Sequence, residues 1–173
     1  MLLDFKYWIE QTEHKYACVL ATINMPEIVK WTKEHVDQDD FYTEEADHGL
    51  ETEPHVTILY GLHRDDIREI KSIIDFIRPF QITLGEINKF ENNQNFDVLK
   101  IQIHSEKLHA INKKFKSLPY TSKYDYNPHC TLAYLKKGAC KNLVGNKEFM
   151  GQKVKIGEIV FSSKNREKTK FKL

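Results

Sequence analysis

One short pattern, present twice, constrains the fold of this chain more than any other feature. The segments PHVTIL at 54–59 and PHCTLA at 128–133 share the pattern Pro-His-x-Thr-aliphatic, and their histidines lie 74 residues apart. In a β-strand the side chains at positions i and i+2 lie on one face, so the His and the Thr of each segment project together. Two matched strands in two half-chains predict a molecule of two related lobes around a shared cleft.

The other elements predict an α+β fold in a single domain, residues 1–173, since no linker rich in Pro, Gly or Ser divides the chain. A doubly wound parallel sheet is disfavoured, because no glycine-rich turn follows the first strand and the last strands lack crossover helices. Asn24 and Ser105 are predicted helix N-caps. Apolar spacing predicts helices within 4–15, 26–35, 65–78 and 106–118, and strands within 15–23, 55–62, 80–92, 96–104, 129–135, 153–163 and 168–173.

The acidic segment 37–53 shows no periodicity. A stretch of this length without regular structure exceeds what compact domains usually tolerate, so it is either a lid over a site or a mobile surface loop. We favour the mobile loop.

Charge and composition exclude several classes of protein. The formal net charge is only +1, which argues against a protein that binds long nucleic acid through contacts to many phosphates. Residues 1–54 carry 4 Lys and 13 Asp or Glu, whereas residues 136–173 carry 11 Lys or Arg and 3 Glu, so the C-terminal third could attract a small phosphate ligand. No apolar run is long enough to span a bilayer, and the N-terminus does not read as a signal peptide. Three cysteines without a C-x-x-C motif fit a reducing cytoplasm.

The paired motifs carry the chemistry that cleavage of a ribose-phosphate ester requires. One neutral imidazole would accept a proton from the attacking oxygen, and one imidazolium would donate a proton to the leaving oxygen. The hydroxyls would hydrogen-bond the phosphate oxygens. A histidine metal site is the second reading, but neither motif has a further ligand at a recognisable spacing. The candidate catalytic residues are therefore His55, Thr57, His129 and Thr131, with no metal and no cofactor.

These motifs resemble those of the two-histidine phosphoesterase superfamily, which includes bacterial RNA 2′,3′-cyclic phosphodiesterases, also described as 2′-5′ RNA ligases. The resemblance covers the chain from about Lys15 to Phe161. It implies a bilobal fold in which antiparallel sheets line a central cleft with helices outside, and metal-independent catalysis by the four motif residues. The small size, the lysine-rich composition and the long insert before the first motif most resemble the phage anti-CBASS nucleases, which degrade cyclic di- and trinucleotide immune signals.

The expected substrate is therefore a small cyclic oligonucleotide, opened at a 3′–5′ bond through a 2′,3′-cyclic phosphate, in the host cytoplasm if the protein is phage-encoded. The first alternative is an RNA-end 2′,3′-cyclic phosphodiesterase. This hypothesis is weakened because arginine is scarce in the chain and absent near either motif. A protein that sequesters nucleotides without turnover is the second. Which histidine is the base stays open. Aromatic side chains would stack on bases and a carboxylate would read a base edge, and the candidate substrate-binding residues are Tyr16, Phe90, Tyr124, Tyr126 and Glu158.

Overall fold

The structure is a computed structural model that describes residues 16–45, 48–122 and 124–173. The helix predicted within 4–15 lies outside the described residues. Within the described ranges, eight strands form one antiparallel sheet in the order β6-β3-β4-β5-β2-β1-β7-β8. The strands are β1 (Ala17–Thr22), β2 (His55–Leu62), β3 (Phe80–Phe90), β4 (Phe96–His104), β5 (His129–Lys136), β6 (Lys153–Ile156), β7 (Glu158–Ser162) and β8 (Lys168–Lys172).

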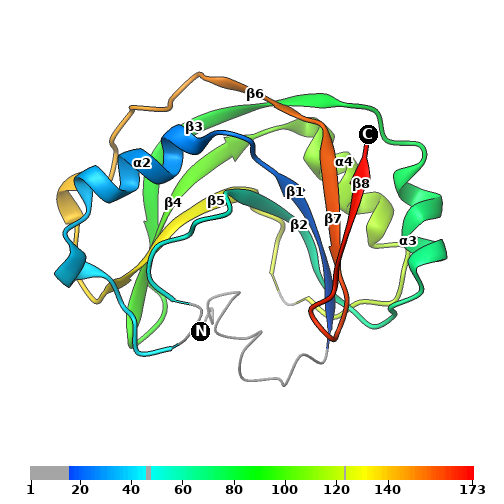
Figure 1. Cartoon of the computed structure of the whole chain (residues 1–173), viewed down its shortest axis with the longest axis horizontal. Helices are drawn as coiled ribbons and strands as arrows, with labels where there is room; N and C mark the ends of the chain where they lie inside the picture. The colour runs from blue at the N-terminus through cyan, green and yellow to red at the C-terminus, as the bar shows by residue number, and fades with distance from the viewer. Residues whose placement is uncertain (1–15, 46–47, 123) are drawn as a thin grey trace.

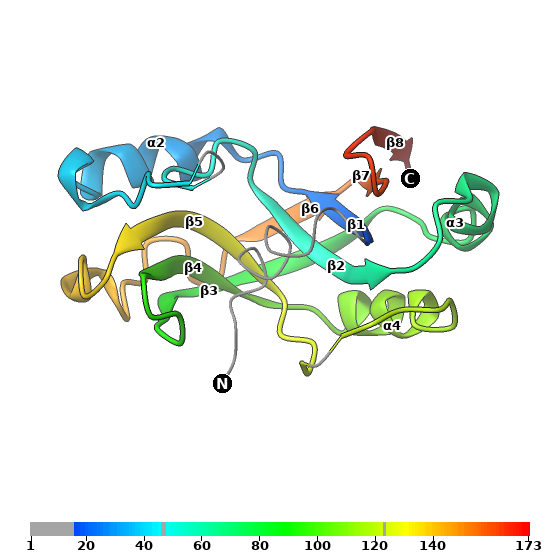
Figure 2. The ribbon, with the colours of Figure 1, turned by 90° about the horizontal axis from the view of Figure 1, so that it is seen from below.

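The sheet consists of two four-stranded halves, which are the two expected lobes. Strands β6, β3, β4 and β5 form one lobe, and β2, β1, β7 and β8 form the other. Only one residue pair, Val56 with Cys130, joins β2 to β5 at the seam between them. The strands bend into an arch, with α2 at one end and α3 and α4 at the other (Figures 1 and 2). The α+β prediction is confirmed.

Three α-helices occur in the described part of the chain, α2 (Pro26–His35), α3 (Ile67–Ile74) and α4 (Glu106–Phe115). The Ser105 hydroxyl accepts a hydrogen bond from the Leu108 amide and caps α4 as predicted. The cap predicted for α2 is wrong, because Met25 and not Asn24 occupies the N-cap position, without a side-chain bond. Pro at the first helical turn starts α2 instead, since its fixed φ already suits a helix.

The larger hydrophobic core among the described residues serves both lobes. It contains buried residues from strands of both halves together with the apolar faces of all three helices, for example Val19, Ile70, Ile101 and Phe115. The helices cross between the halves: α2 follows β1 but contacts β5, and α4 follows β4 but contacts β2. Each strand that carries a Pro-His-x-Thr motif is thus supported by the helix of the opposite lobe.

The strand predicted at 153–163 is in fact two strands that break at Gly157. Strand β6 pairs with β3 at one end of the sheet, and β7 pairs with β1 and β8 at the other. The apolar alternation of Val154 and Ile156 stops at Gly157, and a run of three apolar residues begins at Ile159, so the sequence carries a signal for the break that the predicted single strand overlooked. This segment therefore links the two lobes on the side of the sheet away from the β2–β5 seam.

The prediction of a mobile surface loop at 37–53 is wrong for the residues that the structure describes there. The amide of Tyr42 donates to the Tyr134 carbonyl, and the amide of Glu51 donates to the Leu132 carbonyl, at 3.0 Å each. Tyr42 and Tyr134 also belong to a small buried cluster with Phe96. Backbone hydrogen bonds to β5 and aromatic burial hold the segment beside the second motif, although its sequence has no periodicity.

Candidate active site

The two Pro-His-x-Thr motifs begin the two neighbouring strands at the centre of the sheet. Val56 on β2 pairs antiparallel with Cys130 on β5, and both side chains are fully buried in the core. The His and the Thr of each motif, which stand on either side of this buried residue, are partly exposed and lie on the opposite face of the sheet. In antiparallel pairing the position after one residue faces the position before its partner. His55 therefore lies beside Thr131, and Thr57 lies beside His129.

Both histidine rings are held in the same way. The Nδ1 atom of His55 lies 2.8 Å from the Glu53 carbonyl oxygen, and Nδ1 of His129 lies 2.8 Å from the Asn127 carbonyl oxygen. A carbonyl oxygen only accepts, so Nδ1 of each ring donates its proton. The Nε2 atom of each neutral ring can then accept a proton from a substrate. The same local contact, from the ring to the carbonyl two residues earlier, occurs in both motifs.

The surroundings of His129 favour its neutral form. The pKa of His129 is lowered to about 4, mainly by desolvation and also by the charges of Lys100 and His55, against the hydrogen bond to Asn127. The Phe90 ring packs against the imidazole in an edge-on arrangement, with ring centroids 4.9 Å apart. At neutral pH, His129 is therefore a proton acceptor.

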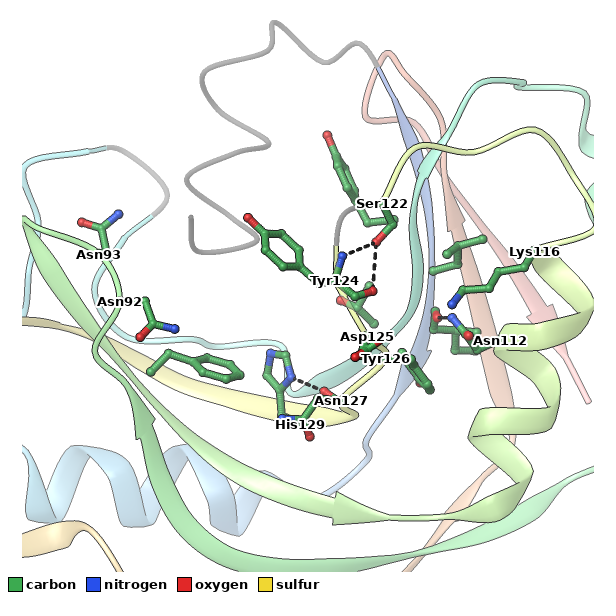
Figure 3. A pocket seen from close by; sticks show the side chains of 15 residues that line it. Asn92, Asn93, Asn112, Lys116, Ser122, Tyr124, Asp125, Tyr126, Asn127 and His129 are labelled. Carbon is green, nitrogen blue, oxygen red and sulfur yellow. Dashed lines mark hydrogen bonds between the residues drawn. The ribbon is translucent and has the colours of Figure 1, made fainter. Parts of the chain in front are cut away.

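The first of two cavities at the motifs, here called the aromatic cavity, has several aromatic side chains in its wall. It measures about 380 Å³ and contains three of the predicted stacking residues, Phe90, Tyr124 and Tyr126. Figure 3 shows Tyr124 and His129 on its wall, with Asn112 and Lys116 contributed from the α4 side. Burial raises the pKa of Tyr126, so its phenol stays protonated. A planar base could enter this cavity beside His129.

The second cavity is polar and lies on the His55 side. It measures about 980 Å³, and the predicted Glu158 lines it. The Glu158 carboxylate accepts a hydrogen bond of 3.1 Å from the Thr22 hydroxyl and lies 3.7 Å from the Lys170 ammonium. Lys168 also lines the cavity and donates to the Glu53 carboxylate at 2.7 Å. The two motifs thus stand between an aromatic and a charged cavity.

Tyr16 does not line either cavity. Its ring stacks on His63, with centroids 5.2 Å apart, and meets Tyr60 edge-on at 6.2 Å. Tyr60 does line the aromatic cavity, so Tyr16 packs against one of the residues of its wall. Lys136 and Lys153, two lysines of the basic C-terminal third, are exposed and line neither cavity.

Sequence reasoning missed Asn112, which the structure brings to the aromatic cavity. Its side-chain amide donates to the Ile58 carbonyl at 2.7 Å and ties α4 to β2. The only signal in the sequence was a polar residue on the buried face of a predicted helix, next to Ile111. Such a residue usually marks a buried hydrogen bond, but its partner cannot be read from the sequence.

Comparison with known proteins agrees with this arrangement. A family model described as the 2′-5′ RNA ligase superfamily matches residues 40–147, which include both motifs and more than half of the chain. The chain belongs to the 2′-5′ RNA ligase superfamily. A search of curated proteins found no match.

Solved structures similar to this superfamily member share its fold. The structure of TT0787 of Thermus thermophilus has a TM-score of 0.61 at 13% identity, over 91% of this chain and 94% of that one. The structure of E. coli LigT complexed with 3′-AMP has a TM-score of 0.60 at 15% identity, over 92% and 95%. A LigT structure complexed with ATP has a TM-score of 0.50 at 17% identity, over the same shares.

Two further observations concern only the described ranges 16–45, 48–122 and 124–173. Within them, no helix is long and apolar enough to cross a membrane. The same ranges hold no group of three or more His, Cys, Asp or Glu side chains arranged to bind a metal ion.

Proposed function

We propose that this protein is a phosphodiesterase that opens 3′–5′ bonds in small cyclic oligonucleotides without a metal ion. One observation carries the proposal: two His-x-Thr motifs lie antiparallel on adjacent strands, and both Nε2 atoms are left unbonded to the backbone. Membership of the 2′-5′ RNA ligase superfamily supports phosphoester chemistry. A ribose-phosphate ester supplies its own nucleophile in the 2′-hydroxyl, which is already close to phosphorus.

The reaction follows from the two histidine environments. Nε2 of His129 accepts the proton of the 2′-hydroxyl, and the 2′-oxygen forms a bond to phosphorus. The bond from phosphorus to the 5′-oxygen breaks, and His55, as imidazolium, gives its Nε2 proton to that oxygen. The products are a 2′,3′-cyclic phosphate and a free 5′-hydroxyl. The hydroxyls of Thr57 and Thr131 hydrogen-bond the phosphate oxygens as charge develops on them.

The two cavities support a substrate with a nucleoside on each side of the phosphate. Tyr124, Tyr126 and Phe90 would stack on one base, each contact contributing about 1–3 kcal/mol. Glu158 would read the second base from the polar cavity, and Tyr16 would support the stacking wall from behind. LigT is described in complexes with 3′-AMP and with ATP, which supports a small nucleotide ligand here as well. Turnover of cyclic oligonucleotide signals would counteract bacterial CBASS defence in the host cytoplasm.

A substrate panel tests this proposal. The full chain is incubated with cyclic dinucleotides, cyclic trinucleotides and RNA ending in a 2′,3′-cyclic phosphate, and the products are separated by chromatography. We expect cleavage of a cyclic oligonucleotide, unaffected by EDTA. His55→Ala and His129→Ala should each lower turnover by about 10²–10⁴-fold, whereas the control His35→Ala, on α2 and outside both cavities, should not.

Each other result of the panel counts against the proposal in a different way. Cleavage of the RNA ends alone would favour an RNA-end 2′,3′-cyclic phosphodiesterase, which the family description supports. Tight binding with recovery of intact nucleotide would favour a sequestering protein. Turnover that is lost on chelation and restored by zinc or manganese would overturn the metal-independent mechanism.

A further inference from the structure

A buried lysine stands next to the second motif on the same face of the sheet. Lys100 on β4 pairs with Thr131 on β5, and Asn88 on β3 pairs with Lys100 from the other side. Leu99 and Ile101, the neighbours of Lys100 along the strand, are buried in the core. Alternation therefore directs Lys100 to the face that carries the motif His and Thr side chains.

The Lys100 ammonium forms no ion pair in the described part of the chain. The residue is only 4% exposed, yet its ammonium makes no hydrogen bond or ion pair there and lies 4.4 Å from the centroid of the Phe90 ring. Lysine is almost never this buried unless it is paired, because desolvation of an ammonium costs several kcal/mol. Desolvation lowers the pKa of Lys100, and the charge of Glu86 opposes this only in part.

Lys89, the neighbouring buried lysine, shows what a structural role looks like in this protein. Its side chain is 2% exposed, and its ammonium lies 3.0 Å from the Asp97 carboxylate, 3.3 Å from the Glu91 carboxylate and 3.0 Å from the Ala139 carbonyl oxygen. Lys100 has none of these partners. A bound anion would give the Lys100 ammonium the ion-pair partner that Lys89 finds within the chain.

The two lobes differ at this position. Thr57 of the first motif has Leu20 on β1 as its neighbour across the strands, whereas Thr131 of the second motif has Lys100. One half of an otherwise matched pair of motifs therefore carries a cation where the other carries an apolar side chain. Because of this asymmetry, a bound phosphate should lie closer to Thr131 and the second motif than to Thr57.

We propose that the Lys100 ammonium binds a non-bridging oxygen of the phosphate that Thr131 also contacts, a role that rests on the proposed function. It would stabilise the additional negative charge as the 2′-oxygen bonds to phosphorus. Its position next to Thr131 also places a positive charge close to His129, which disfavours protonation of that ring in the free enzyme. Lys100 thus both binds the phosphate and helps to determine which histidine is the base.

Titration of the full chain with inorganic phosphate by calorimetry tests this role, together with thermal unfolding. We expect Lys100→Met to weaken phosphate binding about tenfold or more and to leave the melting temperature unchanged or higher, because an apolar side chain then replaces an unpaired buried charge. Lys100→Arg should keep most of the affinity. The control Lys153→Met, an exposed lysine on the edge strand β6 and three strands away from Thr131, should bind phosphate like the wild type.

Unchanged phosphate affinity in Lys100→Met, or no phosphate binding by the wild type, would overturn the role. If Lys100→Met instead lowers the melting temperature, Lys100→Arg decides: restored affinity supports phosphate binding, and affinity as weak as that of methionine contradicts it. The titration does not depend on turnover. A negative substrate panel with Lys100-dependent phosphate binding would therefore reject the cyclic-oligonucleotide function and leave the phosphate site standing.

Discussion

At the scale of the residue, the candidate chemistry depends on how each imidazole uses its two nitrogens. A single hydrogen bond from Nδ1 to the carbonyl two residues earlier fixes the tautomer and the ring direction of both His55 and His129. The rings differ in what surrounds them. Phe90 and Lys100 lie near His129, whereas the Glu53 carboxylate lies near His55. Two copies of one motif are thereby suited to opposite roles.

The depressed pKa of His129 predicts an unusual pH profile. A group whose pKa is lowered to about 4 loses its proton well below the ordinary histidine range, so it can act as a base throughout pH 5–7. We expect the acid limb of kcat/KM for the substrate found in the panel to fall near pH 4 rather than near 6.5. Steady-state rates between pH 3.5 and 8 measure it. An optimum below pH 4 would instead make His129 the acid.

At the scale of the element, an ion-pair cluster fixes the ends of three strands on the far side of the motifs. The buried Asp97 carboxylate on β4 accepts from Lys137 at 2.7 Å, from the Gly138 amide at 2.9 Å and from Lys89 on β3 at 3.0 Å. Burial acts to raise the pKa of Asp97, but these three hydrogen bonds outweigh it, and the net pKa is lowered. The cluster holds β3 and the chain after β5 against β4.

Asp97→Asn should therefore destabilise the protein strongly. It removes the closest carboxylate from the buried Lys89 ammonium and leaves only Glu91 at 3.3 Å, so the loss should approach the value of about 3–5 kcal/mol typical of a broken buried pair. Urea unfolding at pH 7 measures the loss. The exposed pair of Lys71 with Asp75 gives the control, because Asp75→Asn should cost less than about 1 kcal/mol.

The sign of the pH dependence is a second test of the Asp97 cluster. Since the folded-state pKa of Asp97 is lowered, its contribution is present above the ordinary carboxyl pKa of about 4 and is lost as the pH falls through the lower folded value. The difference between wild type and Asp97→Asn should narrow in that acid range. If the difference in unfolding free energy does not change with pH, the charge of Asp97 is not the cause of its stabilising effect.

A glycine at the end of β2 positions the loop that carries the candidate stacking tyrosines. Gly61 has φ +92°, and a Cβ added there would overlap the backbone carbonyl of Thr121. The amide of Thr121 donates to the Gly61 carbonyl at 2.9 Å, so residues 119–122 are docked directly on the strand. Only glycine permits this close approach of two backbones.

Gly61→Ala should displace the loop and weaken substrate binding. We expect KM for the cleaved nucleotide to rise and the melting temperature to fall, both measured on the purified variant. Gly145→Ala is the matched control, because Gly145 also has a positive φ of +81° but a Cβ there would meet no atom within 4 Å. The control therefore carries the backbone strain without the clash. Equal effects in the two variants would contradict a role for the Gly61 contact.

At the scale of the whole molecule, two lobes share one core although a single residue pair joins their sheets. Cys18 on β1 and Cys130 on β5 lie in different lobes. Burial raises the pKa of each thiol to about 12, so neither is a reactive thiolate at pH 8 in the folded protein. Their alkylation consequently reports the unfolding of the lobe in which each lies.

We expect both cysteines to be alkylated at the same rate in mild urea, because a core shared by both lobes should unfold as one cooperative unit. Pulses of iodoacetamide followed by peptide mass spectrometry give the two rates. Cys18→Ser and Cys130→Ser variants identify each peptide signal. Labelling of one cysteine well before the other would show that the lobes open independently and would contradict the single domain proposed for this chain.

The sequence by itself determined the elements and the residues that could carry the chemistry. Strand alternation is a local property, so the pairing of His with Thr on one face, and of Val56 and Cys130 on the other, could be read directly. Helix periodicity and the Ser105 cap are local in the same way. The repeat of the motif then required the two strands to have equivalent places, which the fold confirms.

Only the tertiary structure decided what lies beside these residues. The position of Lys100 next to Thr131, the partners of β6 and β7 and the docking of Tyr42 and Glu51 on β5 all depend on hydrogen bonds between segments distant in the chain. Such registers follow from how the whole core packs, because a shift by one residue would turn each buried side chain outward. No local pattern records that choice, and the surroundings that separate His55 from His129 follow from it.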